Sequence, residues 1–244
     1  MVLRPRSEPM EVVVAPCCPV VELRQYTLRP GKREILVELF DRELVEPQEA
    51  VGMELLGQFR DLDRADRFVW LRGFPDMESR RRSLEAFYGG PVWRANAAAA
   101  NATMVDVDDV LLLRPAAPSS RFGALPPRPA RGDHAPAVTL LATICPLDRP
   151  ADAGELERIL MPRLAAAATP ALAVLVEEPS ENTYPALPVR AGENVVVWFQ
   201  RSPRDAGERA SIDAAADLAR DVLAHMAGPP VQLLLDPTPR SRLR

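Results

Sequence analysis

The sequence predicts an α+β protein built from two tandem copies of a βαββαβ unit. The main observation is a repeat: the run FVWLR, from Phe68 to Arg72, is matched in the second half by VVWFQ, from Val196 to Gln200. Each run follows a helical pattern and an earlier apolar run, and each precedes a second helical pattern and a final apolar run. Copies so far apart in the chain are whole small domains rather than solenoid repeats.

The first copy begins with a strand over 20–28, because this stretch alternates. Val21 and Leu23 fall on one face and Glu22, Arg24 and Tyr26 on the other. The rest of the copy is predicted, in order, as a helix with its apolar stripe over 35–44, strands over 53–60 and 67–74 around a hairpin turn, a helix over 77–88, a short helix over 93–100 and a strand over 104–113.

A stretch rich in Pro, Ala, Arg and Ser over 115–136 indicates a partly extended linker. The order of elements then repeats as a strand over 138–144, a helix over 155–168, a strand over 172–177, a long turn over 179–192, a strand over 194–200, a helix over 205–227 and a strand over 231–235. The predicted organisation is a flexible arm over 1–18, a first unit over 19–115, a linker over 116–136 and a second unit over 137–244.

The order βαββαβ fits the ferredoxin-like split β-α-β arrangement, with a four-stranded antiparallel sheet and both helices on one face. The other face of each sheet is apolar and needs a cover. Because burying apolar area is favourable by ~25 cal/mol per Å², the two sheets are expected to pack on each other as a barrel-like pair within one chain.

Composition excludes several classes of function. The formal net charge is -4 and the sequence pI is about 5.4, and the longest basic run is Arg80-Arg81-Arg82, so no nucleic-acid partner is expected. No apolar run approaches the ~20 residues of a membrane span. Three cysteines, two of them adjacent, make no disulfide framework and favour a reducing, cytoplasmic location. No cysteine or histidine spacing indicates a metal site.

Several motifs, in order, resemble the NIPSNAP family. In the first half these are ELRQYTLRPG (22–31), VWLRGFPDM (69–77) and a middle segment that includes Trp93 and ANATM (100–104). In the second half they are YPALPVR (184–190) and GENV (192–195). The resemblance covers roughly 20–236, although RANAA (94–98) is richer in alanine than the family pattern.

This resemblance implies a fold of the dimeric α+β barrel superfamily, with both barrel halves fused in one chain as a pseudo-dimer. The superfamily includes cofactor-free monooxygenases, heme-degrading monooxygenases, chlorite dismutase-like heme proteins, muconolactone isomerases and polyketide cyclases. Few activities are assigned within the NIPSNAP branch itself, so the resemblance implies no particular reaction.

Candidate catalytic residues are Arg24, Tyr26 and Arg72, because arginine offers a planar donor fork suited to carboxylates and enolates. The same side chains could instead form buried structural pairs, Arg24 with Glu22 or Arg72 with Tyr26. The candidate ligand-binding residues are Trp70, Trp93, Asn101, Tyr184, Arg190 and Trp198. Each has a structural alternative. The tryptophans could pack in the core, Asn101 could cap a turn, and Tyr184 and Arg190 could stabilise the long turn.

Three functions remain open from the sequence. The first is a cofactor-independent enzyme that oxidises, isomerises or cyclises a hydrophobic aromatic or polyketide-like small molecule in specialised metabolism. The second is a non-catalytic small-molecule-binding or scaffold protein, favoured by the lack of an obvious acid, base or nucleophile constellation. The third is a heme protein with His225, placed on the last helix, as axial ligand. An exposed sheet edge also leaves a homodimer open.

Overall fold

Eight strands of the protein close into an antiparallel barrel in the computed structural model, which describes residues 18–134, 138–202, 207–223 and 225–244. Around the barrel the strands run β1, β3, β2, β9, β6, β8, β7 and β5, and β5 pairs again with β1. The predicted N-terminal arm over 1–18 lies, except for Cys18, outside the described residues.

Successive side chains of each strand point to opposite faces of the sheet, as the sequence predicts. They are β1 (Val20–Leu28), β2 (Glu54–Asp61), β3 (Arg67–Phe74), the short β4 (Met104–Asp106), β5 (Val110–Pro115), β6 (Thr139–Pro146), β7 (Ala171–Glu177), β8 (Val195–Ser202) and β9 (Val231–Pro237).

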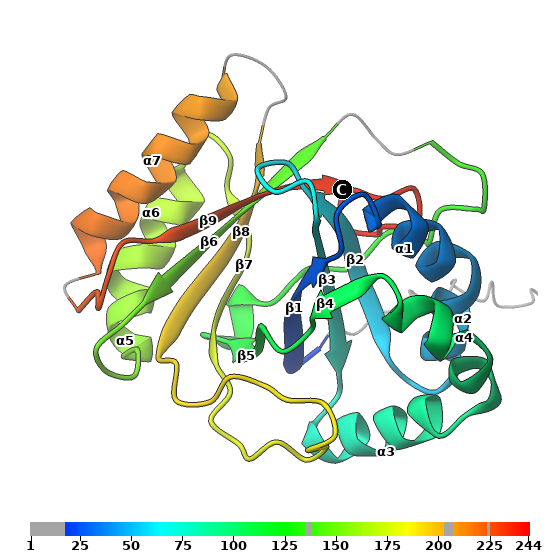
Figure 1. The fold of residues 1–244 in the computed structure, drawn as a ribbon. Coiled ribbons are helices and arrows are strands. Elements are labelled where there is room, and N and C mark those ends of the chain that lie inside the picture. Colours follow the sequence, from blue (N-terminus) through cyan, green and yellow to red (C-terminus); the bar gives the residue numbers. More distant parts are fainter. Residues whose placement is uncertain (1–17, 135–137, 203–206, 224) are drawn as a thin grey trace, which may run out of the picture.

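The helices lie in two groups on opposite sides of the barrel (Figure 1). The first group comprises α1 (Arg33–Leu39), the π-helical η1 (Phe40–Leu44), α2 (Val45–Ala50), α3 (Met77–Tyr88) and α4 (Pro91–Asn101). The second comprises α5 (Ala153–Glu155), the π-helical η3 (Leu156–Leu160), α6 (Met161–Ala166) and α7 (Gly207–Val222). A single 3₁₀ turn, η2 (Pro118–Ser120), follows β5.

The strand order is the same in the two halves of the chain. Taken in the same direction around the barrel, the first half contributes β5, β1, β3 and β2 as neighbours, and the second contributes β9, β6, β8 and β7. In each half the first strand of the copy lies between the last and the third. The halves join at two seams, β2 with β9 around Arg60↔Asp236 and β5 with β7 around Arg114↔Val176. The fold is therefore a mixed α+β barrel closed within one chain.

Three apolar cores follow from this arrangement. The barrel interior takes one face of every long strand and is filled by side chains of both halves, among them Leu23, Leu71, Leu140 and Phe199. A second core lies between the first half's strands and α1 to α4, and a third between the second half's strands and α5 to α7. Glu22, Arg24 and Tyr26 belong to the face of β1 that is covered by helices, whereas Val21 and Leu23 point into the barrel.

Several predicted elements differ in detail. The strand expected over 104–113 is interrupted, because Asp106 turns the chain through its bond to the Asp108 amide, and it forms β4 and β5. The last helix ends at Val222, so His225 lies in the following turn rather than on the helix, as the sequence analysis had placed it. The predicted linker packs closely against the barrel, where Phe122 contacts Phe199. None of the described helices has the length and apolar character needed to cross a membrane.

Cys145 and Cys18 differ in their bonding. Cys145 is a free, buried thiol, and burial raises its pKa to about 12. Cys18 is disulfide-bonded, which the sequence analysis did not predict.

Candidate functional site

A fully buried charge cluster lies between the first half's sheet and its helices. Glu22 of β1 is its centre and accepts from three arginines at once. Arg24 Nη1 and Arg72 Nε both donate to Glu22 Oε2 at 2.7 Å, and Arg80 Nε donates to Oε1 at 2.6 Å. All four side chains are 0% exposed. We call these four residues the Glu22 cluster.

The Glu22 cluster carries more positive than negative charge. Among the described residues, Glu22 is the single carboxylate in ion-pair contact with these three arginines. Burial alone would raise the pKa of Glu22, but Arg72, Arg24 and Arg80 outweigh it and hold that pKa well below its usual range. Burial lowers the pKa of Arg80, and Glu22 only partly opposes that shift.

Each arginine of the cluster retains a buried donor that makes no hydrogen bond. These are Nη2 of Arg24, Arg72 and Arg80, and the indole Nε1 of Trp70 beside them is a fourth. Buried donors are nearly always paired in folded proteins. A surplus of guanidinium groups with unused donors is therefore suited to an additional acceptor that bears negative charge.

Trp70 and Tyr26 form the wall of the cluster. The Trp70 ring lies 4.9 Å from the Arg72 guanidinium carbon and 5.6 Å from that of Arg24. Tyr26 meets Trp70 edge to face at 5.9 Å, and its hydroxyl accepts from Arg24 Nε at 3.0 Å. Burial raises the pKa of Tyr26, so the phenol stays protonated at neutral pH. Trp70 is buried among these groups, so its contacts position the two guanidinium groups.

The long β7–β8 connection of the second half reaches the Glu22 cluster. We call residues 178–194 the bridging segment, which runs from the second half toward α3 in Figure 1. Its Asn182 Oδ1 and Thr183 Oγ1 accept from Arg80 Nη1 at 3.0 and 3.2 Å. Thr183 Oγ1 also donates to the carbonyl of Met77 at 3.1 Å. One half of the chain therefore completes the site of the other.

Aromatic side chains gather where the bridging segment meets α3 and α4. Tyr184 stacks on Tyr88 with ring centroids 6.0 Å apart and planes at 21°. Tyr88 meets Trp93 edge to face at 5.0 Å, and its hydroxyl accepts from Arg72 Nη1 at 3.4 Å. These rings connect the buried Glu22 cluster to the partly exposed surface, where Trp93 and Tyr184 were predicted to bind a ligand.

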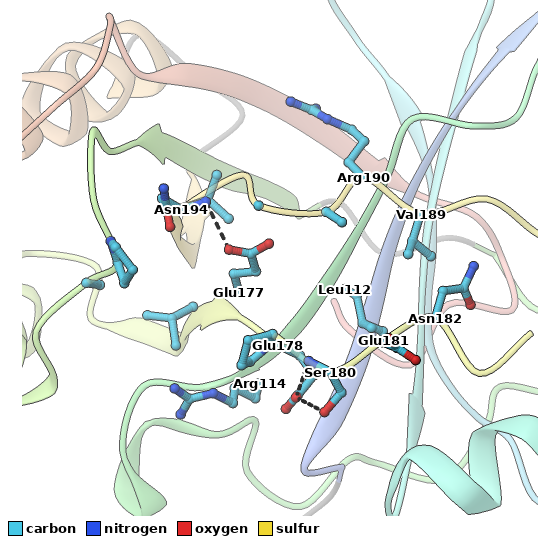
Figure 2. A pocket seen from close by; sticks show the side chains of 17 residues that line it. Leu112, Arg114, Glu177, Glu178, Ser180, Glu181, Asn182, Val189, Arg190 and Asn194 are labelled. Carbon is cyan, nitrogen blue, oxygen red and sulfur yellow. Dashed lines mark hydrogen bonds between the residues drawn. The ribbon is translucent and has the colours of Figure 1, made fainter. Parts of the chain in front are cut away.

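A cavity of about 430 Å³ lies beneath the bridging segment, next to the cluster. Figure 2 shows its lining, with Asn182 and Asn194 at opposite ends. Leu112, which also lines it, pairs across the sheet with Glu22. Asn182, which lines the cavity, is also bonded to Arg80 and so connects the cavity wall to the cluster. The predicted residue Arg190 lies on the cavity wall, where it pairs with Asp109 at 3.0 Å and with Glu193.

Two predicted ligand-binding residues lie elsewhere. Asn101 is exposed at the end of α4. Trp198 is fully buried in the second half's own core, where its Nε1 donates to Gln200 Oε1 at 3.0 Å. Trp198 is the counterpart of Trp70, because Trp70 pairs with Arg24 across the sheet and Trp198 pairs with Thr143. Thr143 therefore corresponds to Arg24, and Leu141, two residues earlier, corresponds to Glu22. The second half therefore has no charge cluster at this place.

Sequence reasoning missed four participants: Arg80, Tyr88, Asn182 and Thr183. Arg80 belongs to the basic run Arg80-Arg81-Arg82, which was considered only as evidence on nucleic-acid binding. The signal was its spacing, because Arg80 shares a helical face with Leu84 and Phe87, which are buried. The contact of Asn182 joins residues far apart in the sequence and has no local signal.

The surroundings of His225 do not fit a heme. Its Nδ1 lies 3.8 Å from an Asp148 oxygen, its side chain is 36% exposed, and the cavity beside it measures about 20 Å³, far too small for a porphyrin. Among the described residues, no group of three or more His, Cys, Asp or Glu side chains is placed to hold a metal ion.

Similar folds occur among solved structures. A protein named "putative monooxygenase" from Fusobacterium nucleatum matches with a TM-score of 0.55 at 11% identity, covering 91% of this chain and 93% of its own. A "putative monooxygenase" from Lactobacillus acidophilus matches with a TM-score of 0.54 at 9% identity, over 90% and 94%. An anthrone oxidase-like protein matches with a TM-score of 0.52 at 14% identity, over 90% and 91%. At these identities the likeness shows the fold alone.

The sequence comparisons place the first half in a family. No curated protein matches this chain. The NIPSNAP family model matches residues 21–120, which include β1, the Glu22 cluster and the aromatic group of α3 and α4. The match does not extend to the second half, whose resemblance to the family stays a prediction. Residues 21–120 therefore match the NIPSNAP family model, and the candidate site lies mainly within this matched stretch.

Proposed function

We propose that this protein is a cofactor-independent enzyme that acts on an oxygenated aromatic or polyketide-like small molecule. The observation that supports this most is the excess of buried guanidinium groups in the Glu22 cluster, with three Nη2 atoms that make no hydrogen bond. Oxidation, isomerisation and cyclisation of such molecules all proceed through an enolate or phenolate. Prearranged donors in a dry site stabilise that anion as it forms.

In this proposal Arg24 and Arg72 bind the oxygen on which charge develops, and Tyr26 orients Arg24 through its hydroxyl. Trp70 fixes both guanidinium planes. Trp93 contacts the flat part of the substrate beside Tyr88, the ring on which Tyr184 stacks, and Arg190 lines the neighbouring cavity. The solved structures of similar fold named as monooxygenases and as anthrone oxidase-like support an oxidation as the first reaction to test.

We also propose that the barrel consists of two tandem ferredoxin-like units, over 19–115 and 137–244, joined by the segment 116–136. The identical strand order in the two halves supports this division. Because the second unit's equivalent positions are uncharged, the pseudo-dimer has one site rather than two.

The test uses an anthrone in air-saturated buffer. Oxidation of its methylene consumes one O₂, with one oxygen atom entering the new ketone and the other leaving as water. Oxygen uptake and quinone absorbance are measured for the unaltered protein and for the Arg24→Gln and Arg72→Gln variants. We expect each variant to lose at least about tenfold in kcat/KM, as for the removal of one oxyanion-stabilising donor. Arg81→Gln, on the exposed side of α3, is the matched control.

Normal turnover in both cluster variants would show that the site is elsewhere. A second function, non-catalytic binding or scaffolding, is favoured by one observation: the barrel interior is filled by apolar side chains of both halves. Saturable binding of the anthrone without oxygen uptake or any other conversion would support that alternative against the enzyme.

A further inference from the structure

We propose that the Arg80 side of the Glu22 cluster is a subsite for the anionic oxygen of an aromatic acid, and that the bridging segment occupies this subsite as an internal mimic of the ligand. This inference rests on the proposed function and narrows its substrate class. It also assigns a role to the second half, which lacks a charge cluster of its own.

The oxygen part of the mimic is the pair of acceptors on Arg80. Asn182 Oδ1 and Thr183 Oγ1 lie 3.0 and 3.2 Å from Arg80 Nη1, where a carboxylate oxygen would be bound. Both acceptors are neutral, so the surplus positive charge of the cluster remains. Arg80 Nη2 still makes no hydrogen bond. An anionic oxygen would form a charge-assisted bond that is stronger than the amide contact it replaces.

The aromatic part of the mimic is Tyr184. Its ring lies almost parallel to that of Tyr88, at 21° and 6.0 Å, two residues along the chain from Asn182. Tyr88 is held from its other sides by Trp93 and by Arg72, which donates to its hydroxyl. The bridging segment thus presents an oxygen and a flat ring to the first half, and a small aromatic acid offers the same two features.

The neighbouring cavity gives such a molecule a place from which to exchange with the segment. Asn182 lines the cavity of about 430 Å³ (Figure 2) and also accepts from Arg80, so in this proposal its displacement brings a molecule in the cavity into contact with Arg80. This volume lies within the usual range for small-molecule sites. The side-chain bonds of Asn182 and Thr183 to the first half are those to Arg80 and Met77. Asn182 also accepts from the Tyr184 amide and donates to the Leu187 carbonyl within the segment, so a local displacement of Asn182 must break these bonds as well.

The experiment measures binding of 1-hydroxy-2-naphthoate to the full-length chain by titration calorimetry. Asn182→Ala removes the competing oxygen, so the acid is expected to bind several-fold more tightly. Asn182→Asp places a carboxylate on Arg80, so binding is expected to weaken by roughly tenfold or more. Arg81→Gln, on the exposed side of α3 and bonded to Glu78 and Glu85, is the control and leaves the Kd unchanged. The neutral methyl ester of the probe is expected to respond to neither Asn182 substitution.

Equal Kd values for the acid across the unaltered protein and both Asn182 variants would overturn the proposal. So would inorganic phosphate that competes with the acid as strongly as a second aromatic acid does, because the ring would then play no part. If Asn182→Asp does not fold, the tightening expected in Asn182→Ala decides alone. Anthrone turnover in the same preparations separates this proposal from the proposed function. Turnover with no change of Kd in the Asn182 variants would refute only the subsite. A change of Kd in these variants without turnover would refute only the proposed enzyme activity.

Discussion

At the scale of single residues, the chemistry of the site depends on how one carboxylate is shared. The alternation of β1 correctly predicts that Glu22, Arg24 and Tyr26 lie on one face, away from Val21. It does not predict that Glu22 also binds Arg72 and Arg80, because those contacts depend on strand pairing and on how α3 packs. Local periodicity determines which face of a strand a side chain occupies, whereas tertiary packing determines which distant residues it pairs with.

Asp41 is a half-buried acid with a raised pKa, which sequence patterns did not reveal. It accepts from Thr238 Oγ1 at 3.3 Å, close to the C-terminal segment. Burial raises the pKa of Asp41 to about 6 from an ordinary value of 3.8, although Thr238 and Arg240 oppose the shift. Between these two pH values the folded state binds more protons than the unfolded state, so this group makes the protein less stable as pH rises through that window.

We therefore predict that Asp41→Asn raises the free energy of unfolding at pH 7.5 by about 1–3 kcal/mol, because it removes the penalty of ionising a buried carboxyl. The gain should largely disappear near pH 4, where Asp41 is protonated in the folded protein. Urea unfolding at the two pH values measures the difference. Asp63→Asn, at an exposed position, is the control, and an equal effect of both substitutions would contradict the assignment.

At the scale of elements, the two halves have the same order of strands, while local features of the sequence set where each element begins and ends. The two π-helical turns, η1 and η3, occupy the same place in each half, and Pro47 and Pro162 follow them. Proline lacks the amide needed for the helical bond, and a wider turn accommodates that loss. Helical periodicity predicted these helices but not the π-helical turns inside them.

Gly57 is a local exception of a different kind. The register of β2 against β3 shifts between Leu55 and Gly57, and a Cβ on Gly57 would lie 2.3 Å from the Phe59 ring. Phe59 is 0% exposed in the barrel interior, so its ring has little room to move. A glycine in a strand often marks such a bulge or close approach.

We predict that Gly57→Ala lowers the free energy of unfolding by about 1–3 kcal/mol, because the added methyl overpacks a filled core. Chemical denaturation measures the change. Gly123→Ala is the matched control, since nothing lies within 4 Å of a Cβ at that position. A similar small change in both variants would mean that β2 absorbs the extra atom and that the close approach has no structural importance.

At the scale of the whole molecule, each half depends on the other. The barrel interior takes side chains from both, the seams β2–β9 and β5–β7 close the ring, and the bridging segment reaches the other half's cluster. The sequence predicted that the two sheets would pack together, because each has an apolar face. It did not predict that only the first half would hold a charge cluster at this place. That difference arises because Leu141 and Thr143 occupy, in the second half, the positions of Glu22 and Arg24.

This interdependence predicts one cooperative unfolding transition. Trp198 reports on the second half, and Trp70 with Trp93 reports on the first. Trp198→Phe leaves Trp70 and Trp93 as reporters of the first half, and the double substitution Trp70→Phe/Trp93→Phe leaves Trp198 as the reporter of the second. In both variants, urea unfolding followed by tryptophan fluorescence should coincide with loss of the far-ultraviolet circular dichroism signal. Because a half that separates exposes its share of the barrel interior and two sheet edges, partly unfolded chains should not accumulate. Separate midpoints for fluorescence and circular dichroism within one variant would show instead that the halves are independently stable and that the bridging segment can release the site without unfolding its neighbour.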